Sequence, residues 1–156
     1  MKRLLPTLIV VMLLFLAACD SNRVYQQAYD FEKSGWHMDT LPSFTFEIED
    51  NRPKNVLLHV RNSIAYEWRN IYLTYHLQDS TGRELASELV NIPLFDPKTG
   101  EPKGKGSSIY QHAVPLFENY NFPSTGTYTF KVAQYMRKTE LKEVLSVGLR
   151  VEEAEE

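Results

Sequence analysis

Apolar and polar residues alternate along several short stretches of the chain from residue 42 onward. The five clearest stretches are residues 44–48, 56–60, 71–77, 128–132 and 145–151. A period of two places one set of side chains in the interior and the other in solvent, so each stretch predicts a β-strand. Two weaker strands are expected around residues 85–92 and 108–116, where the alternation does not decide which face is buried.

Turn-forming residues separate these stretches. The four turn signals lie at residues 50–53, 79–82, 96–100 and 123–126. Asp or Pro begins each of them, and Gly closes three of them where a positive φ is favourable. About seven short strands with such turns, and no convincing amphipathic helix, predict an all-β antiparallel β-sandwich of Ig-like or jelly-roll-like type. We place this domain at residues 42–152, followed by an acidic tail at residues 153–156.

The chain before the sandwich divides into two segments, of which the first is a lipoprotein signal peptide at residues 1–18. Two basic residues precede an unbroken apolar run at residues 8–16, which is far short of the roughly 20 residues that span a bilayer. The run ends in Leu-Ala-Ala-Cys, and a Cys directly after small residues resembles the bacterial lipobox. We therefore expect cleavage between Ala18 and Cys19 and acylation of Cys19 with fatty acids such as palmitate. The plainer alternative is a secreted protein whose Cys lies at the junction by chance.

The second segment, residues 19–41, shows no clean period. Its apolar residues are scattered among polar ones: Val24, Tyr25, Tyr29, Phe31 and Trp36. We interpret this segment as a lipidated tether whose aromatic side chains dock onto the domain.

Composition narrows the class of protein further. The 156 residues include 17 basic and 20 acidic residues, and loss of the signal peptide changes the net charge from −3 to −5. This mildly acidic balance argues against a nucleic-acid binder. It also provides no polybasic segment that would add to the membrane binding of the lipid anchor. The single Cys excludes an intramolecular disulfide and a Cys-based zinc cluster.

Residue sets that could perform catalysis are not apparent. The four His residues show no ligand spacing on one element: His37, His59, His76 and His112. His59 and His76 are expected on outward faces, where pairing of neighbouring strands would bring them together, although plain surface positions are the simpler interpretation. Glu47 and Glu49 share one strand face rather than flanking a cleft, as a glycosidase pair does. We expect no enzyme activity, no metal and no cofactor.

Polar residues interrupt otherwise apolar strands at two places, and these are the candidate interface. They are Arg61-Asn62 and Gln134-Tyr135-Met136-Arg137, for which turn capping is the structural alternative. Six aromatic residues cluster near strand ends: Tyr66, Trp68, Tyr72, Tyr110, Tyr120 and Phe122. Because such residues fill cores as well as interfaces, we assign about two thirds to the core and the rest to one exposed patch. The Lys- and Gly-rich stretch at residues 97–108 is interpreted as a solvated hairpin loop, with a basic contact finger as the alternative.

Several short sequence motifs along the chain resemble those of the GldH family of gliding-motility lipoproteins of the Bacteroidota. The lipobox at Cys19 comes first. The motifs that follow it are Val60-Arg61-Asn62, Asn70-Ile71-Tyr72, Gly126-Thr127-Tyr128, Gln134-Tyr135-Met136-Arg137 and Val147-Gly148-Leu149-Arg150-Val151-Glu152. Their order carries the resemblance, which covers nearly all of the mature chain. It implies membership in a cell-envelope system for surface gliding that is linked to secretion of adhesins. Of the site residues, only the lipidated Cys19 carries over from the family.

The resemblance favours a non-enzymatic lipoprotein that binds the membrane through its lipid anchor and contacts envelope proteins of a gliding and secretion system. The residues after Cys19 lack the acidic run that resembles a surface-export tag, so we expect the domain to face the periplasm. A lipoprotein sandwich that binds a ligand such as a glycan is the first alternative. A hydrolase with a site that the sequence does not reveal is the second.

Overall fold

The computed structural model describes residues 22–32 and 35–155, and this part of the chain consists of strands and loops without a helix. The strands are β1 (Arg23–Asp30), β2 (Trp36–His37), β3 (Ser43–Ile48), β4 (Lys54–Ser63), β5 (Asn70–Asp79), β6 (Glu84–Pro93), β7 (Lys105–Gly106), β8 (Ile109–Tyr120), β9 (Gly126–Gln134), β10 (Glu140–Leu141) and β11 (Val144–Glu153). Among these residues, therefore, none belongs to a helix that could cross a membrane. The predicted signal peptide, with Ala18, and the predicted lipidation site Cys19 lie outside the described residues.

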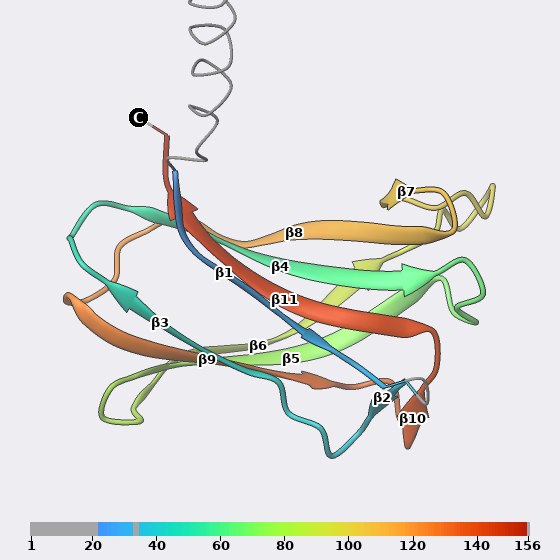
Figure 1. Cartoon of the computed structure of the whole chain (residues 1–156), viewed down its shortest axis with the longest axis horizontal. Helices are drawn as coiled ribbons and strands as arrows, with labels where there is room; N and C mark the ends of the chain where they lie inside the picture. Colours follow the sequence, from blue (N-terminus) through green and yellow to red (C-terminus); the bar gives the residue numbers. More distant parts are fainter. Residues whose placement is uncertain (1–21, 33–34, 156) are drawn as a thin grey trace, which may run out of the picture.

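Two antiparallel sheets lie face to face and enclose the core (Figure 1). One sheet has the order β1-β11-β4-β8-β7, and the other has the order β3-β9-β5-β6. A short pair, β2 with β10, joins residues of two connecting segments beside the sandwich. The predicted all-β sandwich is thus confirmed, and the seven expected strands correspond to β3, β4, β5, β6, β8, β9 and β11.

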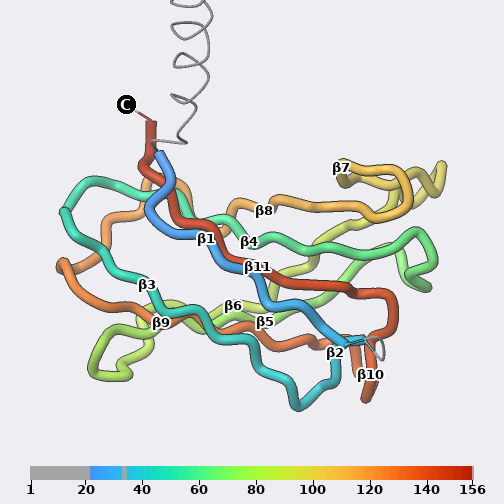
Figure 2. The backbone as a smooth tube through the Cα atoms, viewed as in Figure 1, coloured from blue at the N-terminus to red at the C-terminus, as the bar shows by residue number. Residues whose placement is uncertain are grey.

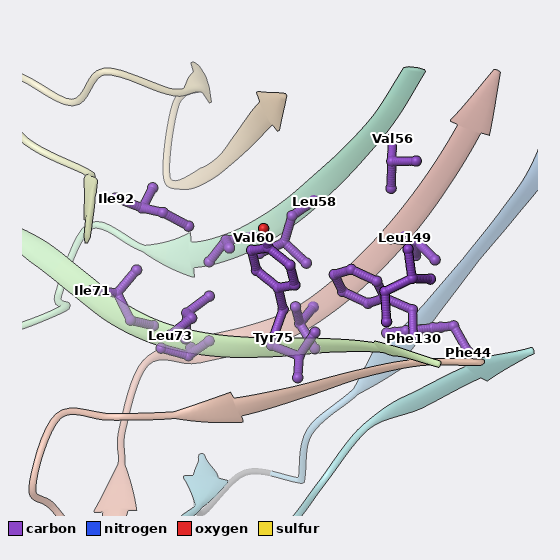
Figure 3. Close-up of a cluster of buried hydrophobic side chains, with 14 of the residues drawn as sticks. Phe44, Val56, Leu58, Val60, Ile71, Leu73, Tyr75, Ile92, Phe130 and Leu149 are labelled. Atoms are coloured by element: carbon purple, nitrogen blue, oxygen red, sulfur yellow. The ribbon is translucent and has the colours of Figure 1, made fainter. Parts of the chain in front are cut away.

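The alternation in sequence becomes an inner and an outer face because each sheet buries one side. In β4 every second residue from Lys54 to Asn62 is buried, and β5 and β9 follow the same rule. Figure 3 shows Leu58 and Val60 from one sheet directed toward Tyr75 and Leu73 from the other. Each aliphatic side chain buried in this way contributes roughly 1.5–3 kcal/mol relative to an exposed one, so the shared interior holds the sheets together.

The sequence does not predict strand β1, because residues 19–41 show no clean period and are interpreted as a tether. Residues 23–30 pair with β11, so the sandwich begins about twenty residues before the expected boundary at residue 42. The pattern was unreadable because β1 is an edge strand with most side chains exposed. Its aromatic residues contact the domain as expected, since Tyr25 packs on Phe46 at 5.6 Å between ring centroids. At the other end, β11 includes Glu153, the first residue of the expected tail.

A close approach of two backbones holds β1 against β11. Gly148 lies opposite Ala28, and a Cβ atom added to Gly148 would lie 2.9 Å from the carbonyl oxygen of Gln27 and 3.4 Å from the Cα of Ala28. Real Cβ atoms do not approach a backbone oxygen so closely, so the pairing of these strands requires Gly at this position.

A buried lysine closes the end of the sandwich at which β1 begins. Lys54 is 1% exposed, and its Nζ donates to Asp50 Oδ1 at 2.6 Å, to Glu153 Oε2 at 2.9 Å and to the carbonyl of Arg52 at 3.0 Å. These three bonds use all donors of the ammonium group. Arg52 also donates to Asp50 and to Glu153 Oε1, which makes a four-residue ion-pair cluster. Hydrogen bonds from Arg52 and then from Lys54 hold the pKa of Asp50 well below its usual range.

We expect Gly148→Val to destabilise the domain by about 1–3 kcal/mol, because overpacking forces β1 away from β11. Urea unfolding of the protein without its signal peptide measures the change, and hydrogen exchange reports the loss of protection in β1. The control is Ala113→Val, which adds the same atoms at an exposed position of β8 on the same sheet. Equal stability of the Gly148 variant and wild type would contradict the close approach.

We expect the domain to lose stability as the pH falls below about 4, the ordinary pKa of Asp. The pKa of Asp50 is lower in the folded chain than in the unfolded chain, so the unfolded chain takes up protons first and acid favours unfolding. Asp50→Asn removes this titration, so its stability deficit at neutral pH shrinks as the pH approaches 2. Urea midpoints at several pH values measure both effects. The control Glu49→Gln, at a neighbouring exposed carboxylate, should follow the wild-type curve; a constant deficit in the Asp50 variant would refute the assignment.

Candidate functional site

Exposed aromatic and apolar side chains gather around a hollow at the end of the sandwich away from the start of β1. The hollow has a volume of about 470 Å³ and is lined by Trp68, Asn70, Tyr72, Leu89, Tyr135, Met136 and Arg137. We call these seven residues the aromatic hollow. They come from the loop between β4 and β5, from β5 and β6, and from the segment that follows β9. Figure 2 shows the β4–β5 loop and the end of β9 in the half of the molecule opposite the C-terminus.

Gln134 organises the segment that follows β9. This residue is buried, its Nε2 donates to the carbonyl of Lys138 at 2.6 Å, and its Oε1 accepts from the backbone N–H of Met136 at 2.9 Å. The two bonds close a tight loop, in which Arg137 has a left-handed backbone with a φ of 56°. The buried amide therefore fixes the loop that it encloses, in which Tyr135 and Arg137 are exposed at the rim and Met136 is partly buried against the core.

The same segment extends the pairing of β9 with β5 beyond the last regular ladder position. The backbone N–H of Tyr135 donates to the carbonyl of Tyr72 at 2.8 Å. The backbone N–H of Tyr72 in turn donates to the sulfur of Met136 at 3.2 Å, so a thioether takes the place of a carbonyl acceptor. These contacts fix Tyr135 and Met136 beside Tyr72 on the outer face of the sheet.

The loop between β4 and β5 supplies Trp68, held between an aromatic ring and a cation. Tyr66 is buried, donates its hydroxyl to the carbonyl of Asn70 at 3.1 Å, and meets the Trp68 ring edge-on at 5.6 Å. Burial raises the pKa of the Tyr66 hydroxyl, so it stays a neutral donor. The Lys138 ammonium lies 5.4 Å from the centroid of the Trp68 ring, within range of a cation–π interaction.

Large apolar and aromatic side chains at the rim of the aromatic hollow are exposed to solvent. Tyr135 is 57% exposed, Leu89 is 50% exposed and Tyr72 is 38% exposed. Arg137 and Lys138 are also exposed beside them, so the patch combines apolar surface with positive charge. The Asn70 side chain, which also lines the hollow, donates to that of Asn91 at 2.6 Å.

A buried polar pair lies at the same end of the other sheet. Asn62 is fully buried, and its Oδ1 accepts from His112 Nε2 at 3.0 Å while its Nδ2 donates to the carbonyl of Ser63 at 2.9 Å. Burial lowers the pKa of His112, which favours the neutral ring. A Cβ on Gly104 would lie 2.8 Å from this ring, so the loop after β6 passes directly over it. This pair fixes the loop rather than offering a reactive group.

The six residues of the predicted interface do not form one surface. Tyr135, Met136 and Arg137 line the aromatic hollow, and Gln134 supports them from the interior. Asn62 is buried in the other sheet, and Arg61 lies on the outer face of that sheet with its Nη1 4.0 Å from Asp30. Sequence reasoning did not connect Tyr72 with Tyr135, because that contact depends on β9 lying beside β5. It missed Leu89 altogether, since the inward face of β6 was not readable.

The aromatic residues singled out in the sequence divide between the core and the surface. Tyr66, Tyr110 and Phe122 are buried, whereas Trp68 and Tyr120 are partly buried and Tyr72 is exposed.

His59 and His76 do not form the cross-strand pair that was the less favoured interpretation of the sequence. The two residues lie in different sheets, because β4 and β5 are joined by a loop that crosses from one sheet to the other. His76 Nδ1 instead lies 2.7 Å from Glu84 Oε2, and His59 Nδ1 lies 3.0 Å from Gln111 Nε2. Among the described residues, no group of three His, Cys, Asp or Glu side chains is arranged to hold a metal ion.

The Lys- and Gly-rich stretch at residues 97–108 is tied to the domain by backbone bonds. Asp96 Oδ1 accepts from the N–H groups of Lys98 and Thr99, and hydrogen bonds to these N–H groups lower the pKa of Asp96. The N–H of Lys103 donates to the carbonyl of Leu94 at 2.8 Å, and the short strand β7 then pairs with β8. The stretch is an ordered loop with surface lysines.

Solved structures with a similar shape are distant in sequence. One is the structure of infectious bursal disease virus Gt strain, with 13% identity and a TM-score of 0.38 over 85% of this chain and 32% of that chain. Another is BtGH115A, a family GH115 4-O-methyl-α-glucuronidase with specificity for decorated arabinogalactans, with 12% identity and a TM-score of 0.43 over 88% of this chain and 18% of that chain. The chain spans about a third or less of the length of these proteins. A search of curated proteins gave no match.

The family comparison covers nearly the whole described sandwich. The model of the family described as GldH lipoprotein matches residues 23–151, from the first residue of β1 almost to the end of β11. The match includes β1 and every residue of the aromatic hollow, and it confirms the resemblance that the sequence motifs indicated. The chain belongs to the GldH lipoprotein family.

Proposed function

We propose that this protein is a non-enzymatic envelope lipoprotein, anchored through Cys19, that supports gliding motility and associated protein secretion through contacts with other envelope proteins. Membership in a lipoprotein family implies a membrane-anchored location at the cell envelope. In the proposal the domain faces the periplasm and docks on its partner through the aromatic hollow.

The observation that carries the proposal is the gathering of Tyr72, Leu89 and Tyr135 beside Arg137 on one exposed rim. Residues that dominate binding energy in protein interfaces are enriched in Trp, Tyr and Arg. Exposed apolar side chains that form one patch indicate an interaction site more strongly than the same residues scattered singly. The loop closed by Gln134 fixes this rim before a partner arrives, which lowers the entropic cost of binding.

The groups whose pKa values are shifted by their surroundings include His112, Asp50 and Tyr66, and their contacts support a structural role for each. His112 donates to Asn62, Asp50 accepts from Lys54, and Tyr66 donates to a backbone carbonyl. Each of these groups is bound to a neighbour that fixes a loop or a strand end. A general acid or base needs a pKa matched to proton transfer and access to a substrate, and none of these three pairings supplies both.

Binding of a glycan in the same hollow is the second candidate function. A volume of about 470 Å³ falls within the range of small-ligand sites, and aromatic rings beside the amide of Asn70 suit the apolar faces and hydroxyls of a sugar. The first candidate is preferred because the exposed surface extends beyond the hollow to Lys138.

We expect Tyr135→Ser combined with Arg137→Glu to abolish function without unfolding the domain, because both side chains are exposed. Loss of two such contacts costs at least about 2 kcal/mol, or roughly thirtyfold in affinity. Chromosomal replacement followed by measurement of colony spreading and of secreted adhesin checks the outcome, and the variant should match a gene deletion. Urea unfolding verifies that its stability equals that of wild type.

The matched control is Tyr29→Ser combined with Lys98→Glu, which removes another exposed ring and reverses a charge outside the hollow. This control should spread and secrete like wild type. A hollow variant that keeps both activities while the deletion loses them would rule out the docking surface. A hollow variant that loses binding on a glycan array but still crosslinks its protein partners in cells would favour the second candidate.

A further inference from the structure

The place where β1 begins sets how far the domain can stand from its membrane. We infer that the sandwich is held directly at the bilayer and that its partner is a protein of the same membrane. This inference rests on the lipid anchor at Cys19 in the proposed function. The start of β1 at Arg23 leaves Asp20, Ser21 and Asn22 between the anchor and the first strand.

The reach of this connection is limited by covalent geometry, whatever conformation it adopts. Four residue steps separate Cys19 from Arg23, and four fully extended residues span at most about 14 Å. A free tether at residues 19–41, as expected from the sequence, would reach about 80 Å on the same scale. Pairing of β1 with β11 therefore shortens the reach of the anchor by more than fivefold.

Strand β1 is attached firmly enough to keep this connection short. Its residues pair with β11 along the whole strand, and Arg150 Nη1 donates to Gln26 Oε1 at 3.0 Å. The N–H of Glu153 also donates to the carbonyl of Asn22 at 2.7 Å, so attachment extends one residue before the strand. At the other end, Phe31 stacks on the buried ring of Trp36 at 4.7 Å.

The aromatic hollow lies one strand length from this attachment. β1 begins beside the end of β11 and the start of β4, whereas the hollow lies beyond the end of β4, at the β4–β5 loop (Figure 1). Ten residues of β4 span about 33 Å at the usual rise of a strand. The hollow lies on the other sheet, and packed sheets are about 10 Å apart, so it lies within about 60 Å of the bilayer whichever way the domain tilts.

A protein embedded in or anchored to the same membrane brings its extramembrane surface into this range continuously. Confinement of both proteins to one surface also raises their effective concentration, so a modest contact suffices. The exposed cations Arg137 and Lys138 beside the aromatic rim fit a partner surface with an apolar centre and carboxylates at its edge. The partner is thus defined by the membrane that holds it and by the charge of its contact surface.

Energy transfer to lipids tests the distance directly. The full-length lipidated protein is placed in vesicles with acceptor dyes on the lipid headgroups, and a donor dye is attached to Asn51→Cys, near Lys54, or to Leu89→Cys, at the hollow. Because the sulfur of Cys19 carries the lipid, each introduced thiol is the one available for labelling. We expect strong quenching of the Asn51 donor and weaker quenching of the Leu89 donor.

A linker of twenty Gly and Ser residues inserted between Asn22 and Arg23 should reduce the quenching of both donors severalfold. The matched control carries the same insert after Gly100, in an exposed turn, and should leave the quenching of the Asn51 donor unchanged. An Asn51 donor that is quenched no more in the native protein than in the Asn22 insert variant would overturn the inference.

Crosslinking in living cells tests the partner. A photoreactive amino acid at Tyr135 should capture proteins that carry a membrane span or a lipid anchor of the same membrane, whereas one at Tyr29 should not. Capture at Tyr135 of a protein confined to the other membrane would refute the inference. The proposed function fails separately, if Cys19→Ala protein remains in the membrane fraction or if the hollow variants keep their activity.

Discussion

The pairing of β11 on both of its sides is the contact on which the rest of the structure depends. β11 lies between β1 and β4, and its inward residues Val147 and Leu149 are completely buried in the core. Removal of this strand would separate the first segment of the domain from its largest sheet. Gly148 allows the close backbone approach on one side, and the Lys54 cluster secures the strand end on the other. The sequence motif around Gly148 that resembles the family thus lies in the strand that joins β1 to the rest of the sheet.

The sequence was sufficient for the architecture because most strands bury one face only. Alternation along residues 56–60 and 71–77 becomes visible when inward and outward side chains face different environments. It failed for β1, an edge strand that is exposed along most of its length, and for the inward face of β6, the edge strand of the other sheet. β3 is an edge strand too, but its alternation is clear because every second side chain is buried. The pattern is weak in β1 and β6 because few of their side chains are buried.

The candidate site was predictable only in pieces. Polar interruptions pointed to Gln134 and Arg137, and the aromatic content pointed to Trp68 and Tyr72, but no pattern in the sequence states that β9 lies beside β5. Asn62 interrupts the apolar pattern of β4 for a different reason. Its side-chain oxygen accepts a hydrogen bond from the buried ring of His112, beneath the loop that follows β6. A polar residue in an apolar strand therefore marks either a surface or a buried hydrogen bond, and strand order is needed to distinguish them.

The pairing of the first strand with the last one has a consequence for biogenesis. β1 and β11 are the first and last strands of the described chain, so more than a hundred residues must be made before the two strands can meet. Contacts between residues so distant in sequence form slowly, because a long loop must close first. Until β11 is available, β1 has no partner strand, and the edge of β4 that β11 covers in the folded domain is unpaired. Open strand edges of this kind can pair with other chains, so the domain needs protection from aggregation until its last strand is in place.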